Sequence, residues 1–339
     1  MSHADKTTNN PAKNERIIEL LKEKEGYLSG AEIASALGVT RAAIWKRINA
    51  LRKKGYFIEG SPTKGYKLMN SPELSLETIR SAISKESLKI GRDLIFYDNL
   101  SSTNTAAVEL AQKGYPEGTV IIADEQTSGK GRLGRTWISP KGKNLHMSII
   151  LQPSISPREA TILTLMSAVS CCIALRKLLS IPISIKWPND LMVNDKKIGG
   201  ILTEINADID KIAYAVIGIG ININLDIENL PEDVMAIATS IKNETGEQFS
   251  RTAVVIEVLR EIQKWYDILL RKGKKDILSY WRDLSSTIKR EVKVTMENKV
   301  FMGVAEGIDE EGLLILKLPD NSLMKVNAGD ITMLRERGK

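Results

Sequence analysis

Histidine is almost absent from this sequence, which has only His3, in a polar N-terminal stretch, and His146, in a segment that predicts a strand. Imidazole is the side chain most often used for proton transfer near neutral pH. We therefore do not expect acid–base catalysis by histidine. The sequence also lacks a Ser-His-Asp or Cys-His arrangement and any ligand spacing typical of zinc. Any catalysis should rest on positioning and electrostatics.

Cysteine is equally scarce and occurs only as the adjacent pair Cys171 and Cys172, in an apolar stretch that predicts a helix. We interpret the pair as small buried side chains, not as a disulfide or a metal site, which fits a reducing compartment. The opening segment MSHADKTTNNPAKN lacks the apolar core of a signal peptide, and no uncharged segment long enough to span a membrane is expected. The sequence predicts a cytoplasmic protein without a membrane partner.

The chain is long enough for two or three domains, because 339 residues exceed what one hydrophobic core usually organises. Lysine and arginine number 48 against 42 acidic residues, which gives a net charge of +6. This balance permits polyanionic partners without requiring them.

The N-terminal region predicts a helix-turn-helix. A first helix is expected from a capping residue, Asn14, to about Leu21; a second begins at Ser29 and ends before Gly38. A third helix follows, and its apolar stripe leaves a cationic side exposed. Its residues expected to contact DNA are Thr40, Arg41, Lys46 and Arg47. The alternative is a helical module that binds protein through a charged face.

The segment YFIEGSPTKGYKLM alternates apolar and polar residues around a turn, which predicts a hairpin and so a winged helix. Lys64 at its tip would contact phosphate or remain solvated. We assign residues 1–70 to this domain, with the helix-turn-helix at about 30–49. Residues 71–286 alternate strands and helices, and residues 287–339 predict short strands of a small β-barrel.

The segment QTSGKGRLGRTW is the strongest functional signal. Its glycines allow sharp turns and close approach to a ligand, and its cations suit a phosphate or carboxylate. A solvated basic hairpin is the alternative reading. In KWPND, Lys186 and Asp190 bracket a stiff turn. They would either belong to a binding site or only form an ion pair that caps the turn. Lys196 and Lys197 then precede two glycines, so a second ammonium group is placed beside accessible backbone.

QTSGKGRLGRTW, KWPND, KKIGG and GIGIN follow an STN motif and a winged helix in this order. Together they resemble the bifunctional biotin protein ligases that also repress the biotin operon, the biotin--[acetyl-CoA-carboxylase] ligase family. The resemblance implies a central mixed-sheet α/β domain similar to class II synthetases and biotin-lipoate ligases, followed by an SH3-like barrel. It implies formation of biotinyl-5'-AMP from biotin and MgATP, then transfer of biotin to a lysine of biotin carboxyl carrier protein.

The resemblance also implies residue roles. Catalysis would use Lys197, Arg132, Lys186 and Asp190. Biotin would contact Ser102, Thr103, Asn104, Gln126, Gly129, Lys130, Gly131, Arg132 and Lys197. The nucleotide would contact Arg132, Arg135, Trp137 and Asn222, and Mg²⁺ would be carried mainly by ATP phosphates. Lys130 departs from the usual arginine, so its charge is kept but the planar guanidinium is lost.

The partners implied are the carrier protein, operator DNA and a second copy of the chain when biotinyl-5'-AMP is bound as corepressor. Two classes of function remain open on the residues themselves: an enzyme that is also a repressor, or a repressor that senses a metabolite without turnover.

Overall fold

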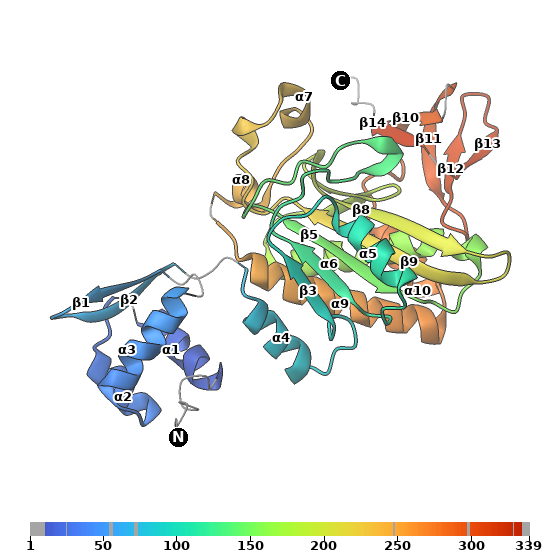
Figure 1. Cartoon of the computed structure of the whole chain (residues 1–339). Coiled ribbons are helices and arrows are strands. Elements are labelled where there is room, and N and C mark those ends of the chain that lie inside the picture. Colours follow the sequence, from blue (N-terminus) through green and yellow to red (C-terminus); the bar gives the residue numbers. More distant parts are fainter. Residues whose placement is uncertain are drawn as a thin grey trace. The chain divides into compact units, whose positions relative to one another are not determined.

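The computed structural model describes residues 11–24, 26–53, 57–70, 74–246, 248–296, 299–327 and 329–333. The chain divides into two compact units, Met1–Ser75 and Leu76–Lys339, drawn in Figure 1. Each unit has its own core, and each is described by itself.

The first unit contains the predicted helix-turn-helix and hairpin. Its elements are α1 (Pro11–Glu23), α2 (Gly30–Leu37), α3 (Arg41–Lys53), β1 (Phe57–Ser61) and β2 (Gly65–Asn70). Ser29 caps α2 in a reciprocal pair with Glu32, and Gly38 ends the helix with φ 59°, a left-handed conformation that suits glycine. The strands β1 and β2 pair antiparallel. The helix-turn-helix prediction is confirmed.

Two details of this unit were wrong. Asn14 does not begin α1 but lies inside it, buried, and its Oδ1 accepts a hydrogen bond from Arg47 Nη1 at 3.0 Å. Arg47 is only 5 % exposed, so it does not belong to the exposed side of α3. The two residues are far apart in the sequence. Helical periodicity cannot predict a hydrogen bond between two polar side chains of different helices, here α1 and α3. Arg41 and Lys46 are exposed as expected.

The second unit is built on a seven-stranded mixed sheet in the order β3-β4-β5-β9-β8-β7-β6. Only β3 and β4 pair in parallel among these strands. The strands are β3 (Leu94–Tyr97), β4 (Val120–Ala123), β5 (Leu145–Leu151), β6 (Ser184–Lys186), β7 (Asp190–Val193), β8 (Lys196–Ala207) and β9 (Ile212–Ile221). Asn194 and Asp195 form the predicted turn between β7 and β8, with φ 47° and 62°.

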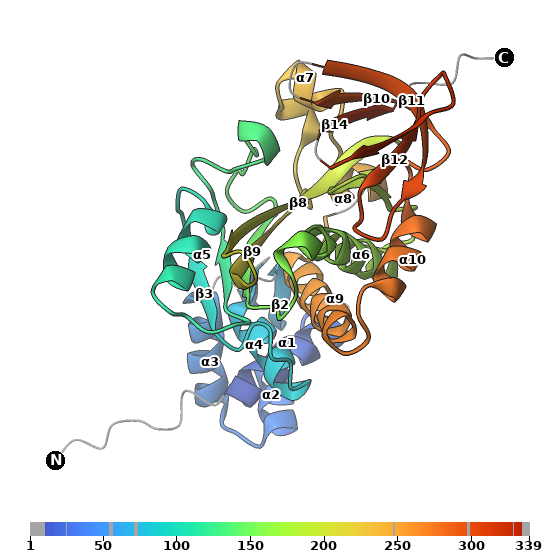
Figure 2. The ribbon, with the colours of Figure 1, turned by 90° about the vertical axis from the view of Figure 1, so that its right-hand side faces the viewer.

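Helices cover both faces of this sheet. Figures 1 and 2 show α5 (Thr103–Gln112) on one face, with α6 (Thr161–Leu178) and α9 (Arg251–Lys272) on the other. The remaining helices are α4 (Leu76–Lys85), α7 (Glu232–Met235), α8 (Ile241–Thr245) and α10 (Lys275–Leu284). Short 3₁₀ turns lie at Arg132–Gly134, Pro157–Glu159 and Ile227–Asn229.

The helix that contains the cysteines is a core helix. Cys171 and Cys172 are free and fully buried, as predicted. By length and composition alone, the segment Pro157–Leu178 is apolar enough to cross a membrane, so the expectation that no such segment exists was too strong. Most of the segment is buried between the sheet and α9, which accounts for its apolar composition.

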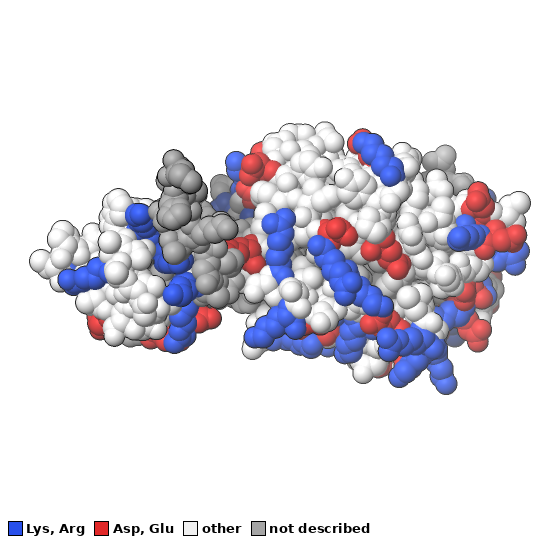
Figure 3. Space-filling view, turned by 60° about the horizontal axis from the view of Figure 1, so that its bottom comes forward, with Lys and Arg blue, Asp and Glu red and all other residues white. Residues whose placement is uncertain are grey.

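Many basic side chains of the larger unit lie beside acidic ones and form ion pairs with them. Figure 3 shows Lys and Arg side chains standing among Asp and Glu over the larger unit. Lys177 Nζ lies 3.0 Å from Glu257 and 2.5 Å from Glu261, and Arg260 pairs with Glu86 and Glu257. The net charge therefore does not by itself define a surface for a polyanion.

The C-terminal residues form a five-stranded antiparallel sheet in the order β13-β12-β11-β10-β14. Its strands are β10 (Glu291–Met296), β11 (Lys299–Ile308), β12 (Leu314–Lys317), β13 (Leu323–Val326) and β14 (Asp330–Met333). This sheet is joined to the KWPND turn, because Trp187 Nε1 donates to the Gly312 carbonyl at 3.0 Å and Trp187 N donates to Thr287 Oγ1 at 2.9 Å.

Replacing Trp187 with Phe should therefore lower the free energy of unfolding of the second unit by more than the smaller ring alone would. The matched control is Trp281→Phe, because the Trp281 side chain is also fully buried but its Nε1 has no hydrogen-bond partner in the described part of the chain. We expect W187F to lower the free energy of unfolding by about 1 kcal/mol more than W281F, measured by urea titration. Equal losses would show that the bond to Gly312 contributes nothing.

Candidate active site

Two glycines of β9 leave hollows in one face of the large sheet. Gly220 pairs with Gly200 on β8 and with His146 on β5, and Gly218 pairs with Leu202 and Ser148. A Cβ atom on Gly220 would lie 2.7 Å from Trp137 Cε2, and one on Gly218 would lie 2.1 Å from Asn104 Oδ1. Trp137 and Asn104 can therefore rest directly on the sheet, which a side chain at either glycine would prevent.

A buried polar network lies at the start of α5. Thr103 donates to Gln126 Oε1 from its backbone N at 2.8 Å and from its hydroxyl at 3.1 Å. Ser148 Oγ is 2.8 Å from Thr103 Oγ1 and donates to Asn104 Oδ1 at 2.6 Å. Asn104 Nδ2 in turn donates to Glu204 Oε2 at 2.7 Å. The network holds several donors and acceptors in fixed positions before any ligand binds.

Ser102 stands at the end of this network, as the residue that precedes α5. Its side chain makes no capping hydrogen bond to the helix, and the residue is 3 % exposed. Gln126 Nε2 donates to Ser139 Oγ at 3.0 Å, which fixes the orientation of the amide that faces Thr103.

The segment QTSGKGRLGRTW folds into a hairpin beside this network. Trp137 N donates to the Gly129 carbonyl at 2.8 Å, and Gly131 N donates to the Arg135 carbonyl at 2.7 Å. A Cβ on Gly129 would lie 2.4 Å from the Trp137 carbonyl oxygen, so glycine is required there. Leu133 occupies the tip with φ 55° and is 68 % exposed.

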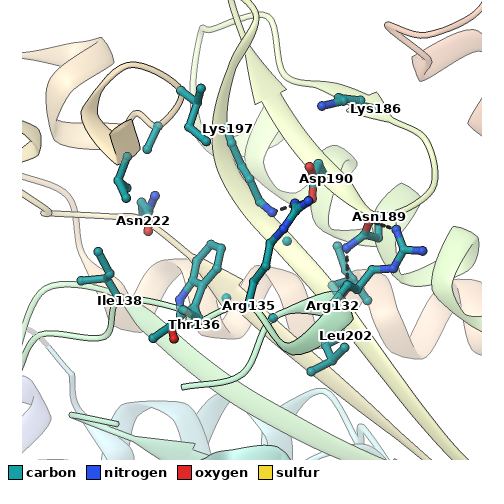
Figure 4. A pocket seen from close by; sticks show the side chains of 18 of the residues that line it. Arg132, Arg135, Thr136, Ile138, Lys186, Asn189, Asp190, Lys197, Leu202 and Asn222 are labelled. Atoms are coloured by element: carbon teal, nitrogen blue, oxygen red, sulfur yellow. Dashed lines mark hydrogen bonds and ion pairs between the residues drawn. The ribbon is translucent and has the colours of Figure 1, made fainter. Parts of the chain in front are cut away.

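Four cations surround one carboxylate at the other end of the site. Lys197 Nζ is 2.6 Å from Asp190 Oδ1 and 5.4 Å from the centre of the Trp137 ring. Figure 4 shows Arg135 directed toward the same carboxylate, and Arg132 bound to Asn189, whose Oδ1 accepts from Arg132 Nη1 at 3.0 Å.

The other lysine of KWPND, Lys186, lies opposite Asp190 in the β6–β7 ladder. The turn-capping alternative placed Asp190 in an ion pair with Lys186, but the carboxylate pairs with Lys197. Burial lowers the pKa of Lys186, with Lys197 and Arg135 acting in the same direction and Asp190 opposing them. Burial also lowers the pKa of Arg132. The cluster carries excess positive charge, which suits an anionic ligand.

These groups line one cavity of about 1050 Å³. It is bordered by the following residues from the sequence prediction: Ser102, Thr103, Asn104, Gln126, Lys130, Gly131, Arg132, Arg135, Trp137, Lys186, Asp190, Lys197 and Asn222. Gly129 lines a smaller adjoining hollow. Residues of the C-terminal sheet, including Arg290 and Ile331, also border the cavity. The structure thus brings together side chains that are more than 100 positions apart in the sequence.

Known proteins of the same organisation exist. Residues 96–222 match the model of the biotin/lipoate A/B protein ligase family, residues 13–67 match an HTH domain, and residues 287–334 match the biotin protein ligase C-terminal domain. The chain is 38 % identical to the bifunctional ligase/repressor BirA of Bacillus subtilis, over 94 % of this chain and 97 % of the relative. The BirA of Escherichia coli is 31 % identical, over 94 % and 96 %.

The chain belongs to the family of bifunctional biotin ligases and repressors. A solved structure supports this at the level of the fold: the biotin protein ligase of Aquifex aeolicus, in complex with biotin and ATP, aligns with a TM-score of 0.62 at 29 % identity. The alignment covers 72 % of this chain and all of that one. As a member of this family, the chain is a ligase with an N-terminal helix-turn-helix.

Several residues of this biotin ligase site were missed by sequence analysis. Ser148 and Glu204 complete the polar network, and Asn189 holds Arg132. His146 was set aside, yet it borders the cavity. A signal was present for two of them: His146 and Ser148 are two apart in a strand, which places them on one face. Within the described residues, no group of three or more His, Cys, Asp and Glu could hold a metal ion.

His146 is 1 % exposed, and neither ring nitrogen has a hydrogen-bond partner among the described residues. Burial lowers its pKa to about 4, with Arg251 adding to the shift. The folded ligase therefore keeps the ring neutral where the unfolded chain, with an ordinary pKa near 6.5, would protonate it.

Folding stability should consequently fall as the pH drops from about 6.5 to about 4, by roughly 3 kcal/mol from this residue alone. The variant His146→Phe removes the titrating group, so its stability should fall less over the same range than that of the parent. Urea titrations of both proteins at several pH values measure the difference. Parallel pH profiles would contradict the assignment of a neutral, buried ring.

Proposed function

We propose that this protein is an ATP-dependent biotin protein ligase that forms biotinyl-5'-AMP from biotin and MgATP. It then transfers biotin to a lysine of the biotin carboxyl carrier protein of acetyl-CoA carboxylase, and it represses the biotin operon with biotinyl-5'-AMP as corepressor. The observation that carries the proposal is one cavity with a hydrogen-bonded polar network at one end and clustered cations at the other. A ligand with a ureido ring and a carboxylate has this same division.

Biotin would lie with its ureido ring at the network formed by Ser102, Thr103, Asn104 and Gln126. Ser102, Thr103 and Asn104 are buried and Gln126 is half-buried, so an analogue without a matching polar ring would leave their donors and acceptors unpaired. The hairpin glycines Gly129 and Gly131 would let backbone approach the ring from above. This arrangement favours biotin over lipoate, whose dithiolane ring offers no such partners.

The biotin carboxylate would then lie among the cations near Lys197 and Arg132. In the first step, a carboxylate oxygen forms a bond to the α-phosphorus of ATP, and the bond from that phosphorus to the pyrophosphate oxygen breaks. Two anions must approach each other and negative charge moves to the leaving oxygen. Fixed cations at Lys197, Lys186, Arg132 and Arg135 lower the free energy of that arrangement, which is the main catalytic contribution expected here.

In the second step, a neutral lysine amine of the carrier protein attacks the acyl carbon, AMP leaves with the electrons of the acyl–phosphate bond, and the amine loses its proton. Before either step, when the biotin carboxylate enters, Lys197 would leave its ion pair with Asp190 and bind the ligand. We assign the cationic hairpin the task of excluding water from the mixed anhydride, since water would compete with the amine.

The nucleotide would lie near Trp137 and Asn222. Trp137 is half-buried on the glycines of the sheet, and Asn222 is held by a bond from its Nδ2 to the Thr239 carbonyl at 3.0 Å. Mg²⁺ would be held mainly by the ATP phosphates, because the carboxylate of Asp190 is already paired with Lys197. The exposed Lys130 would supply charge to the ligand without bidentate contact.

The finer features of the fold and assembly belong to the same proposal. The central domain would have a fold similar to that of class II synthetases. The C-terminal sheet would close into an SH3-like barrel. The protein would act in the cytoplasm. It would form a homodimer when biotinyl-5'-AMP is bound, so that two helix-turn-helix units reach two half-sites of an operator.

Incubation of the protein with biotin, ATP, Mg²⁺ and a purified carrier domain tests the ligase activity. The carrier should gain the mass of one biotin less one water, and the gain should require ATP. An unchanged carrier mass, with biotin bound to the protein, would point instead to a repressor that senses biotin without turnover.

Lys197→Ala should lower the rate of adenylate formation by roughly 10²- to 10³-fold, because one preorganised cation is lost from the transition state. Lys196→Ala is the matched control: Lys196 is the exposed neighbour on the same strand and does not border the cavity. Pyrophosphate release with biotin and ATP measures both rates. A near-normal rate for K197A would remove Lys197 from the catalytic set.

Operator binding should depend on the adenylate. We expect sedimentation to show dimers with biotinyl-5'-AMP and monomers without it, and gel shifts to show tighter DNA binding under the first condition. Removing residues before about 75 should abolish DNA binding while adenylation persists. If dimerisation and DNA affinity do not change with the adenylate, the corepressor mechanism is wrong. Loss of adenylation on truncation would show that the two units depend on each other.

A further inference from the structure

Trp45 is the exception among the tryptophans of this chain. Three of the five are almost fully buried, namely Trp187, Trp265 and Trp281, and Trp137 is half-buried in the candidate active site. Trp45 lies on α3 with 58 % of its surface exposed. Tryptophan is highly buried on average, and Trp45 has the most exposed side chain of the five. Its place on α3, more than its exposure, is what gives it significance.

The indole lies on the exposed face of α3, on the side of the helix away from the core. Ile44 and Ile48 point into the core and are 0 % exposed, whereas Arg41, Ala42 and Lys46 are exposed. Residues three and four apart share a helix face, and long side chains lean toward the N-terminus of their helix. Trp45 therefore covers the turn of Arg41 and Ala42, which is the N-terminal half of α3.

That half of α3 is where the second helix of a helix-turn-helix meets base edges in the major groove. Thr40, at its start, is committed to the helix itself, because its hydroxyl accepts from Ala43 N at 3.2 Å. Trp45 carries no charge and its ring is mostly apolar. The one apolar group that base pairs present in the major groove is the C5-methyl of thymine.

We propose that Trp45 is a specificity-determining residue of the DNA-binding unit and reads thymine through its C5-methyl group. The proposal rests on the repressor half of the proposed function. Charge complementarity favours DNA as the occupant: Arg41, one turn before Trp45, and Lys46, the next residue, are both exposed, and in DNA the anionic phosphates border the thymine methyl groups. Trp45 thus supplies sequence selectivity, and the two cations supply affinity that does not depend on sequence.

The test removes the methyl group alone. A duplex is first selected from a random pool by the full chain with biotin and MgATP, and each thymine is then replaced by deoxyuridine. At one or two positions of each half-site, we expect the substitution to weaken binding about fourfold, which is the effect of one buried methyl group. Trp45→Ala should weaken binding to the selected duplex roughly tenfold and abolish its response to deoxyuridine.

Lys46→Ala is the matched control on the same exposed face. It should weaken binding to all duplexes alike, reduce the dependence of affinity on salt, and keep the response to deoxyuridine. Trp45→Ala should leave the salt dependence unchanged, because the indole carries no charge. Equal affinity of W45A and the parent for a duplex of unrelated sequence verifies that the DNA-binding unit of the variant is folded, because the cations that bind phosphate are unchanged.

The possible failures can be told apart. If no thymine of the selected duplex responds to deoxyuridine, or if W45A responds as the parent does, the reading of thymine by Trp45 is wrong while repression stands. Unchanged DNA binding by W45A would mean that the indole faces a protein instead. If the pool yields no preferred sequence, the repressor function fails and this inference fails with it.

Discussion

The ion pair between Lys197 and Asp190 organises the cationic end of the site. An ammonium group that is partly withdrawn from water costs free energy unless an anion compensates it, and Asp190 does so at 2.6 Å. The pair lies beside the Trp137 ring, which rests on Gly220 and Gly200. The strand glycines, the aromatic ring and the ion pair are thus stacked on one another. A Cβ on Gly220 would displace the Trp137 ring, and one on Gly200 would lie 3.1 Å from Lys197 Cε.

The KWPND turn connects this unit to the C-terminal sheet. Asp190 begins β7, Asn189 orients Arg132, and Trp187 is bonded to Gly312 and Thr287 in the C-terminal part of the chain. Three residues of one turn therefore tie the cations to a separate sheet. Because that sheet also borders the cavity, its contribution to the site is to hold the cationic end in place as well as to enclose it.

The sequence predicted those features that depend on local patterns. The strands of the C-terminal sheet, the capping residue Ser29, the turn at Asn194 and Asp195, and the glycine-rich hairpin all follow from short-range periodicity and turn chemistry. Features made by distant residues were not predictable in this way. The bond from Arg47 to Asn14, the Ser148 link between Thr103 and Asn104, and the choice of Lys197 over Lys186 as partner of Asp190 each depend on strand order and helix packing.

The two ends of the cavity also differ in how complete they are. At the polar end, Thr103, Asn104 and Gln126 satisfy one another and neighbouring groups. At the other end, among the residues described, Trp137 Nε1 and both nitrogens of His146 are buried without partners. Buried polar atoms without partners cost free energy, so this arrangement is less stable than one that a ligand or a shifted indole would complete. A ligand that enters should therefore find the polar end already formed and should rearrange the Trp137 end, where its own polar atoms can pair with those that lack partners.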